Sequence, residues 1–173
     1  MAGDKFLFRD PTTGKVTEDR ATEVSTGTSE AGDIVALDST GKLDPSLFPA
    51  GFGEDLAVLE ASEAISAGSY VNVFDDAGVE KIRLADSTVA GREAHAFVRT
   101  AIAANATGTI YFEGANDALT GLTIGSRYYL TSAGGVTTTV PSAPTDVFSQ
   151  LVGVAISATA INTDIDDCIG LIA

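Results

Sequence analysis

The sequence has almost no cysteine or histidine, two residue types on which many enzymes and metal proteins depend. Among its 173 residues there is one cysteine, Cys168, one histidine, His95, and no tryptophan. A single cysteine excludes an intramolecular disulfide framework. One cysteine and one histidine are also too few for a zinc site built from those ligands. No run of about 18 apolar residues occurs, so the sequence predicts no membrane-spanning helix.

Basic residues are scarce as well. Lys and Arg number 10 against 24 Asp and Glu, which gives a formal net charge of −14. Such a surface repels a phosphate backbone and an anionic bilayer, so we expect neither nucleic acid nor a membrane as partner. The first ten residues, MAGDKFLFRD, lack an apolar signal core, and we therefore expect synthesis in the cytoplasm.

The sequence contains no arrangement of residues that predicts catalysis. His95 has no G-x-S-x-G nucleophile motif to serve, and Cys168 lies in an apolar run that predicts a small buried residue. The carboxylates of residues 164–167 are close together, but Ile169 stands where a calcium loop needs glycine. We therefore predict no enzyme, no catalytic residues, no cofactor and no metal site.

Residues 56–173 have the pattern of an all-β domain. Apolar segments recur about every 8–12 residues and are separated by Gly, Pro and Asp, which favours a barrel or sandwich over an α/β fold. Tyr70–Phe74 alternates in period two, and the turn residues 75–78 connect it to a second strand over Val79–Leu84. The expected fold is an antiparallel β-barrel or sandwich, jelly-roll or β-tulip-like.

Three further assignments complete this domain. We predict a strand over Ala94–Val98, a loop from Gly114 to Gly121, and the longest strand over Phe148–Ile156. Gly153 inside that last strand predicts a β-bulge or a close approach of another backbone.

Residues 1–55 are predicted to form an extended N-terminal arm and linker. A short apolar strand spans Lys5–Arg9, and residues 10–15 read as a turn. Residues 16–28 are too polar to bury a core of their own. The segment is then either a flexible terminus or an arm that adds a strand to a partner's sheet. Further on, the sequence predicts a brief strand at Ile34–Leu37 and a short turn capped by Asp44, with the following proline at its first position.

Two groups of residues resemble structural proteins of tailed bacteriophages. Residues 31–49, AGDIVALDSTGKLDPSLFP, are similar to a segment in which a strand and turn precede a leucine, an acidic residue, a small residue, an apolar pair and a proline. The segments GSRYYL at 125–130 and GGVT at 134–137, then Pro141 and LVGVAIS at 151–157, resemble the C-terminal β-domain of phage head-decoration, or capsid cement, proteins.

The resemblance implies a virion structural protein on the outer capsid surface, made in the host cytoplasm. Its partners would be the major capsid protein and further copies of itself, as a homotrimer that clamps neighbouring capsid subunits. We expect the arm to add a strand to an exposed capsid edge. The predicted partner-binding residues are Phe6, Leu7 and Phe8, with Ile34, Leu37, Leu47 and Phe48 as a second set.

The same resemblance leaves an alternative open. Related glycine-paced hairpin patterns occur in tail fibres, head fibres and spikes, which take part in host attachment. The sequence has no long repeat or coiled-coil shaft, which lowers but does not remove this alternative.

Overall fold

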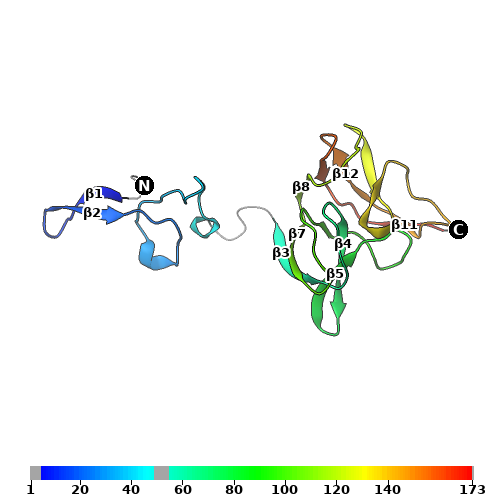
Figure 1. The fold of residues 1–173 in the computed structure, drawn as a ribbon, viewed down its shortest axis with the longest axis horizontal. Helices are drawn as coiled ribbons and strands as arrows, with labels where there is room; N and C mark the ends of the chain where they lie inside the picture. The colour runs from blue at the N-terminus through cyan, green and yellow to red at the C-terminus, as the bar shows by residue number, and fades with distance from the viewer. Residues whose placement is uncertain (1–4, 49–54, 173) are drawn as a thin grey trace. The chain divides into compact units, whose positions relative to one another are not determined.

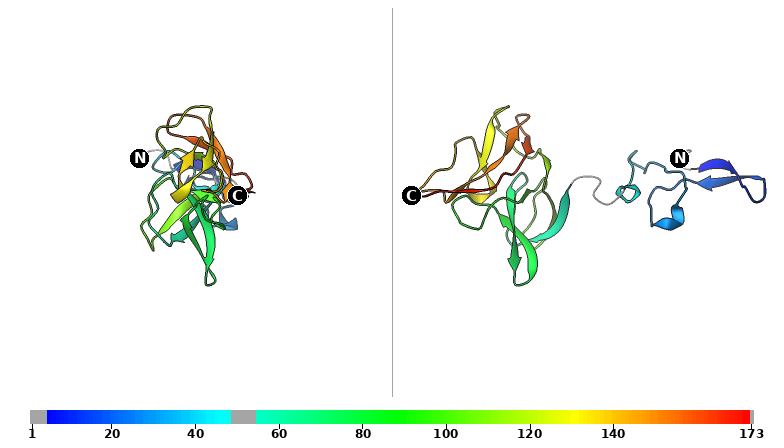
Figure 2. Two further views of the ribbon diagram at one scale, coloured as in Figure 1. Left: turned by 90° about the vertical axis from the view of Figure 1, so that its right-hand side faces the viewer. Right: turned by 180° about the vertical axis from the view of Figure 1, so that it is seen from behind.

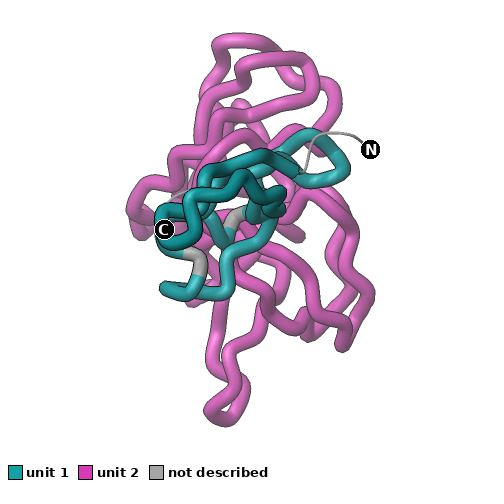
Figure 3. The backbone as a smooth tube through the Cα atoms, turned by 90° about the vertical axis from the view of Figure 1, so that its left-hand side faces the viewer, with its two compact units in different colours: residues 1–53 teal, residues 54–173 magenta. Residues whose placement is uncertain are grey.

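The computed structural model describes residues 5–48 and 55–172, and its regular structure is almost entirely β-strand. No α-helix is present in those residues, where the helical segments are single 3-10 turns. None of these turns has the length or hydropathy to span a membrane. The chain forms two compact units, Met1–Gly53 and Glu54–Ala173, called unit 1 and unit 2 below (Figures 1 and 3). The predicted all-β class is confirmed, whereas the division into an arm and linker over residues 1–55 and a β-domain over residues 56–173 stays a prediction.

Unit 1 begins with an antiparallel hairpin of β1 (Lys5–Arg9) and β2 (Val16–Arg20). The predicted turn between them is confirmed, because the Asp10 carboxylate accepts hydrogen bonds from the backbone N–H groups of Thr12 and Thr13 at 2.7 and 3.2 Å. The sequence did not predict β2, since VTEDR has no apolar alternation and both of its faces are polar. The arm is therefore a hairpin at this end and not a single strand with a polar tail.

The strand predicted at Ile34–Leu37 is reduced in the structure to one isolated bridge. Val35 pairs in parallel with Thr22, and the bridge is closed by backbone hydrogen bonds of 2.8 and 3.0 Å. A 3-10 turn, η1 (Thr28–Glu30), lies between the two bridged residues in the chain. One bridge provides too few ladder bonds to make a strand, so this prediction was wrong.

The capped turn near residue 45 forms as predicted. It is the 3-10 turn η2 (Pro45–Leu47), and the Asp44 carboxylate accepts a hydrogen bond from the backbone N–H of Ser46 at 2.9 Å. The Ser46 hydroxyl oxygen in turn accepts a bond from the backbone N–H of Ser25 at 2.8 Å. The turn is therefore tied to the segment that follows β2. The exit glycines at 51 and 53 lie outside the described residues.

Unit 2 contains a small closed barrel of five strands. In barrel order these are β3 (Leu56–Ala61), β5 (Val79–Leu84), β4 (Tyr70–Asp76), β6 (Ala96–Phe97) and β7 (Thr107–Tyr111). The predicted β4–β5 hairpin is confirmed and projects from the rest of the unit (Figures 1 and 2). β3 and β5 pair in parallel, so the prediction of an antiparallel barrel is wrong for this one pair.

A second, antiparallel sheet packs beside the barrel. Its strand order is β10 (Val136–Thr137), β9 (Arg127–Leu130), β12 (Leu151–Ala155), β13 (Ile161–Thr163) and β8 (Gly114–Asn116). The position of β8 corrects the sequence prediction, which had a loop starting at residue 114. Three residues of low β-propensity, Gly-Ala-Asn, form this strand because the edge of β13 is open to them.

Gln150 explains two further departures from the predicted strands. Its buried side chain accepts a hydrogen bond from the Ala94 N–H at 2.8 Å and donates to the carbonyls of Ala94 and Asp166 at 3.1 and 3.0 Å. Because both backbone groups of Ala94 bond to an amide side chain, the strand predicted over Ala94–Val98 shrinks to β6. The strand predicted over Phe148–Ile156 is likewise interrupted at Gln150.

The interruption leaves β11 (Phe148–Ser149), which pairs with β14 (Ile169–Gly170) in a separate two-stranded ladder. The remaining 3-10 turn, η3 (Ser132–Gly134), joins β9 to β10. Cys168 next to β14 is exposed. The prediction that it is a small core residue was therefore wrong, because β14 is an outer ribbon with both of its residues exposed.

Gly153 in β12 is an irregularity that the sequence did predict. The register against β9 shifts between Leu151 and Gly153. Gly153 has φ of +145°, and a Cβ atom there would lie 2.2 Å from the backbone oxygen of Asn162. Both the bulge and the close backbone approach are confirmed, and only glycine fits the position.

Two apolar clusters hold unit 2 together. The first fills the barrel and consists of Ala61, Ile65, Val71, Ile82, Ala96, Val98, Ile102 and Ile110. The second joins the barrel to the second sheet and consists of Tyr70, Ala85, Ala94, Phe97, Tyr128, Leu130, Phe148, Val152, Ala155 and Ile161. In the second cluster the rings of Tyr70 and Phe97 lie 6.1 Å apart. Burial raises the pKa of Tyr70, whose hydroxyl is hydrogen-bonded to that of Thr163 at 3.2 Å. The barrel and second sheet therefore share one interior.

Candidate partner-binding site

The seven predicted partner-binding residues all lie in unit 1, where no side chain that the structure describes in residues 5–48 is buried. Leu7 is 71% exposed, Leu37 55%, Ile34 52% and Phe8 37%. The other three, Phe6, Leu47 and Phe48, are half-buried. Unit 1 thus contrasts with unit 2, which has two buried clusters.

Most charged side chains of the β1–β2 hairpin lie on the face opposite its two aromatic rings, whereas Asp19, the cross-strand partner of Phe6, shares the aromatic face. Successive residues of a strand face opposite sides, so Phe6 and Phe8 share one face, and their ring centroids lie 6.2 Å apart. Leu7 lies on the other face with Lys5 and Glu18, which form an ion pair. Among the predicted residues of β1, the structure brings Phe6 and Phe8 together and directs Leu7 away from them.

Carboxylates fix the turns of unit 1. Several hydrogen bonds hold the pKa of Asp10 below its ordinary value, and the bond from the backbone N–H of Thr12 has the largest effect. At Asp38 the backbone N–H of Lys42 has the largest effect, followed by the Thr40 hydroxyl, and the pKa is again lowered. These turns place the segments of unit 1 without an apolar core.

Both units carry net negative charge. Residues 1–53 carry nine acidic and five basic side chains, a net charge of −4, whereas residues 54–173 carry fifteen and five, a net charge of −10. Within unit 1, β1 contains two basic residues and no acidic one, and β2 contains Glu18, Asp19 and Arg20. The two units therefore carry similar net charge for their length, and charge does not set unit 1 apart from unit 2.

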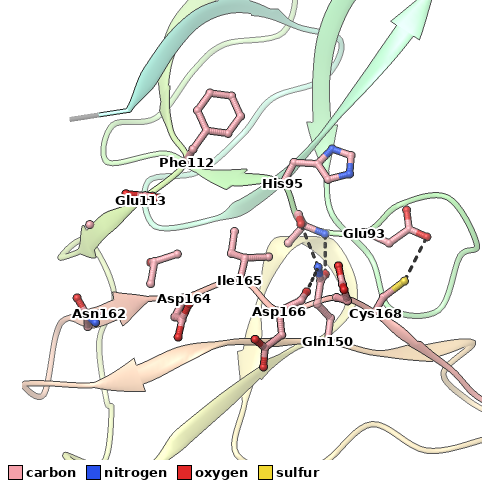
Figure 4. Close-up of a pocket in the computed structure, with 14 residues that line it drawn as sticks. Glu93, His95, Phe112, Glu113, Gln150, Asn162, Asp164, Ile165, Asp166 and Cys168 are labelled. Atoms are coloured by element: carbon pink, nitrogen blue, oxygen red, sulfur yellow. Dashed lines mark hydrogen bonds between the residues drawn. The ribbon is translucent and has the colours of Figure 1, made fainter. Parts of the chain in front are cut away.

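Unit 2 contains a cleft of about 810 Å³ with polar walls (Figure 4). Glu93 and His95 come from the segment before β6, and Asp164, Asp166 and Cys168 come from the segment after β13. The sequence did not predict this cleft, because its walls are far apart in the chain and only the pairing of the two sheets brings them together. Its carboxylates are those of Glu93, Glu113, Asp164, Asp166 and Asp167.

The cleft residues do not assemble into a catalytic group. His95 is exposed, and its Nδ1 accepts a hydrogen bond from the backbone N–H of Val73 at 3.1 Å. The Cys168 thiol instead contacts the Glu93 carboxylate at 4.0 Å, so the two residues have different partners. Across residues 5–48 and 55–172, no group of three or more His, Cys, Asp or Glu side chains is arranged to hold a metal ion.

Comparison with known proteins gives one match to report. No protein-family model matches the chain, and no curated protein matches it. Among solved structures, the N base of the head fibre gp8.5 of bacteriophage phi29 is similar to this chain, with a TM-score of 0.45 and 11% sequence identity. The match covers 66% of this chain and 95% of that one. A TM-score below 0.5 does not establish a common fold.

Proposed function

We propose that this protein is a structural component of the head of a tailed bacteriophage, attached to the outside of the shell through unit 1. The observation that carries the proposal is a contrast between the two units: the described side chains of residues 5–48 include no buried one, whereas unit 2 has its own core. Apolar side chains that are exposed within their own unit are stabilised when a partner buries them. The motifs at residues 31–49 and 125–157 resemble structural proteins of tailed bacteriophages, and we therefore expect the partner to belong to a phage head.

The mechanism of attachment follows from the properties of unit 1. β1 and β2 each have one neighbour in their sheet, so each keeps one edge that can pair with a further strand. The apolar residues Phe6, Leu7 and Phe8, with Ile34, Leu37, Leu47 and Phe48, would be covered by the shell and by neighbouring copies. Unit 2, which has its own core, would face outwards.

Clamping of neighbouring capsid subunits is the specific role that we propose for this attachment. Many copies on one particle act together, so a weak single contact becomes a strong collective one. A homotrimer would place three copies of unit 1 near each junction of capsid subunits and link them.

A second candidate is a head fibre or spike component that takes part in host attachment. A self-contained β-domain joined to a separate attachment unit suits such a protein equally well. Removal of the protein from particles distinguishes the two roles. Loss of a clamp lowers the temperature at which filled heads release DNA, whereas loss of a fibre lowers host adsorption and leaves that temperature unchanged.

The attachment itself is tested with undecorated shells of the parent phage. The wild-type chain is expected to co-sediment with them, and the double variant Phe6→Ser, Phe8→Ser is expected to bind at least tenfold more weakly. Ile124→Ser is the matched control, because it removes an exposed apolar side chain (68%) from unit 2. Equal binding by all three proteins would contradict attachment through unit 1.

A further inference from the structure

The aromatic face of the β1–β2 hairpin includes a carboxylate. Asp19 of β2 is the direct cross-strand partner of Phe6, and Thr17 is the partner of Phe8. Directly opposed residues of an antiparallel pair have Cβ atoms about 4.5–5.5 Å apart and project from the same face. Asp19 is exposed, and the two rings next to it lie 6.2 Å apart. The face therefore combines an aromatic pair with one negative charge.

This carboxylate limits what can cover the rings. Under the proposed attachment a partner buries the apolar side chains of the hairpin, and a partner that covers Phe6 also takes Asp19 out of water. Burial of a carboxylate without a matching cation or hydrogen-bond donor is strongly unfavourable. Within the hairpin, Oδ1 of Asp19 accepts a hydrogen bond from the backbone N–H of Arg20 at 2.8 Å, whereas a carboxylate has about four acceptor sites. A wholly apolar partner surface is therefore a poor fit, and a partner that supplies a cation is a good one.

Arginine is the cationic side chain that suits both parts of the face. Its planar guanidinium stacks on aromatic rings and donates paired hydrogen bonds to a carboxylate, whereas the compact ammonium of lysine offers only a point charge. Unit 2 contains a comparable arrangement within its own chain. The guanidinium carbon of Arg99 lies 4.2 Å from the centre of the Tyr111 ring, and its Nε lies 3.9 Å from Oδ1 of Asp117. A ring and a carboxylate on neighbouring positions thus hold an arginine in this protein.

We propose that Phe6, Phe8 and Asp19 form the binding site for an arginine side chain of the shell protein, which stacks on the rings and bonds to the Asp19 carboxylate. This inference rests on the proposed attachment of unit 1 to a phage shell and adds the chemistry of the partner. The net charge of −14 favours the same kind of partner, because basic side chains attract this chain. Asp19 makes the contact specific, since an uncharged surface leaves its carboxylate unmatched.

Binding of variants to undecorated shells of the parent phage is the first test. Asp19→Asn is expected to bind at least about tenfold more weakly than wild type, because the guanidinium loses its counter-charge. Asparagine keeps an oxygen that accepts the bond from the Arg20 N–H, so the hairpin is retained. Asp167→Asn is the matched control, because it removes one exposed carboxylate from unit 2, and it is expected to bind within about twofold of wild type. Equal binding by Asp19→Asn and wild type would overturn the proposal.

Chemical modification of the shells tests the identity of the partner side chain. On shells whose arginines are blocked with phenylglyoxal, wild type and Asp19→Asn are expected to bind equally, because neither finds a guanidinium. On shells whose lysines are acetylated, the difference between the two proteins is expected to persist. A difference that persists on arginine-blocked shells, or that disappears only on acetylated shells, would refute an arginine partner.

The same assay separates failure of this site from failure of the attachment itself. If the double variant Phe6→Ser, Phe8→Ser binds more weakly while Asp19→Asn binds as wild type does, attachment through unit 1 stands and the arginine site is refuted. If both variants bind as wild type does, the proposed attachment and the arginine site are refuted together.

Discussion

Replacement of Gln150 by methionine tests the hydrogen bonds by which this side chain holds the segments around Ala94 and Asp166 together in unit 2. The side chain is 4% exposed and makes three hydrogen bonds, to the N–H and carbonyl of Ala94 and to the carbonyl of Asp166. Methionine has a similar shape but makes none of these bonds. Each of the three backbone groups that loses its hydrogen-bond partner costs about 1–2 kcal/mol.

The sum is about 3–6 kcal/mol, a large part of the roughly 5–15 kcal/mol that stabilises a typical domain. For a unit of 120 residues, Glu54–Ala173, this corresponds to a fall in melting temperature of about 10–20 °C. Thermal unfolding followed by circular dichroism measures it. Asn162→Met is the control, because it makes the same kind of change at an exposed position of β13 and is expected to shift stability by no more than about 0.5 kcal/mol. A melting temperature of Gln150→Met within about 2 °C of the wild-type value would contradict this account. The hydrogen bonds of Gln150 to Ala94 and Asp166 would then contribute little to the stability of unit 2.

Two further perturbations test local features of the fold. Gly153→Ala is expected to destabilise unit 2 by about 3 kcal/mol or more, because the residue combines a φ of +145° with a Cβ position 2.2 Å from the Asn162 oxygen. Urea unfolding measures this loss of stability, and a change in the midpoint smaller than that of Asn162→Met would contradict the bulge. The lowered pKa values of Asp10 and Asp38 mean that their turns in unit 1 are fully stabilised above the ordinary value of 3.8 and lose this stabilisation as the pH falls through the lower folded value. In an NMR titration, the amide signals of the hydrogen-bonded residues should therefore have midpoints below 3.8, and midpoints at or above that value would contradict the turn geometry.

The sequence predicted those parts of the fold that local chemistry determines. Alternation over Tyr70–Phe74 and the Asp-Asp-Ala-Gly turn after it predict the β4–β5 hairpin, and both form. Gly153 predicted the irregularity in β12, because glycine inside an apolar strand marks a place where a side chain does not fit. The Asp44–Pro45 turn was predictable for the same reason, since a capping carboxylate and a fixed φ act within a few residues.

Features that depend on distant segments could not be predicted in this way. β2 has no apolar alternation and is a strand only because β1 lies beside it. Gln150 interrupts a predicted strand because its side chain meets Ala94, 56 residues away in the chain. The walls of the acidic cleft come together for the same reason. Among the predicted partner-binding residues of β1, only the structure separates the aromatic pair Phe6 and Phe8 from Leu7.

Co-sedimentation of the purified chain with undecorated shells of the parent phage tests the central claim most directly. We expect binding that saturates near a fixed number of copies per capsid subunit, and no binding to isolated tails. Such saturation would support attachment to the outside of the head through unit 1. A chain that stays in the supernatant with shells, or that binds tails instead, would contradict a role as a head protein.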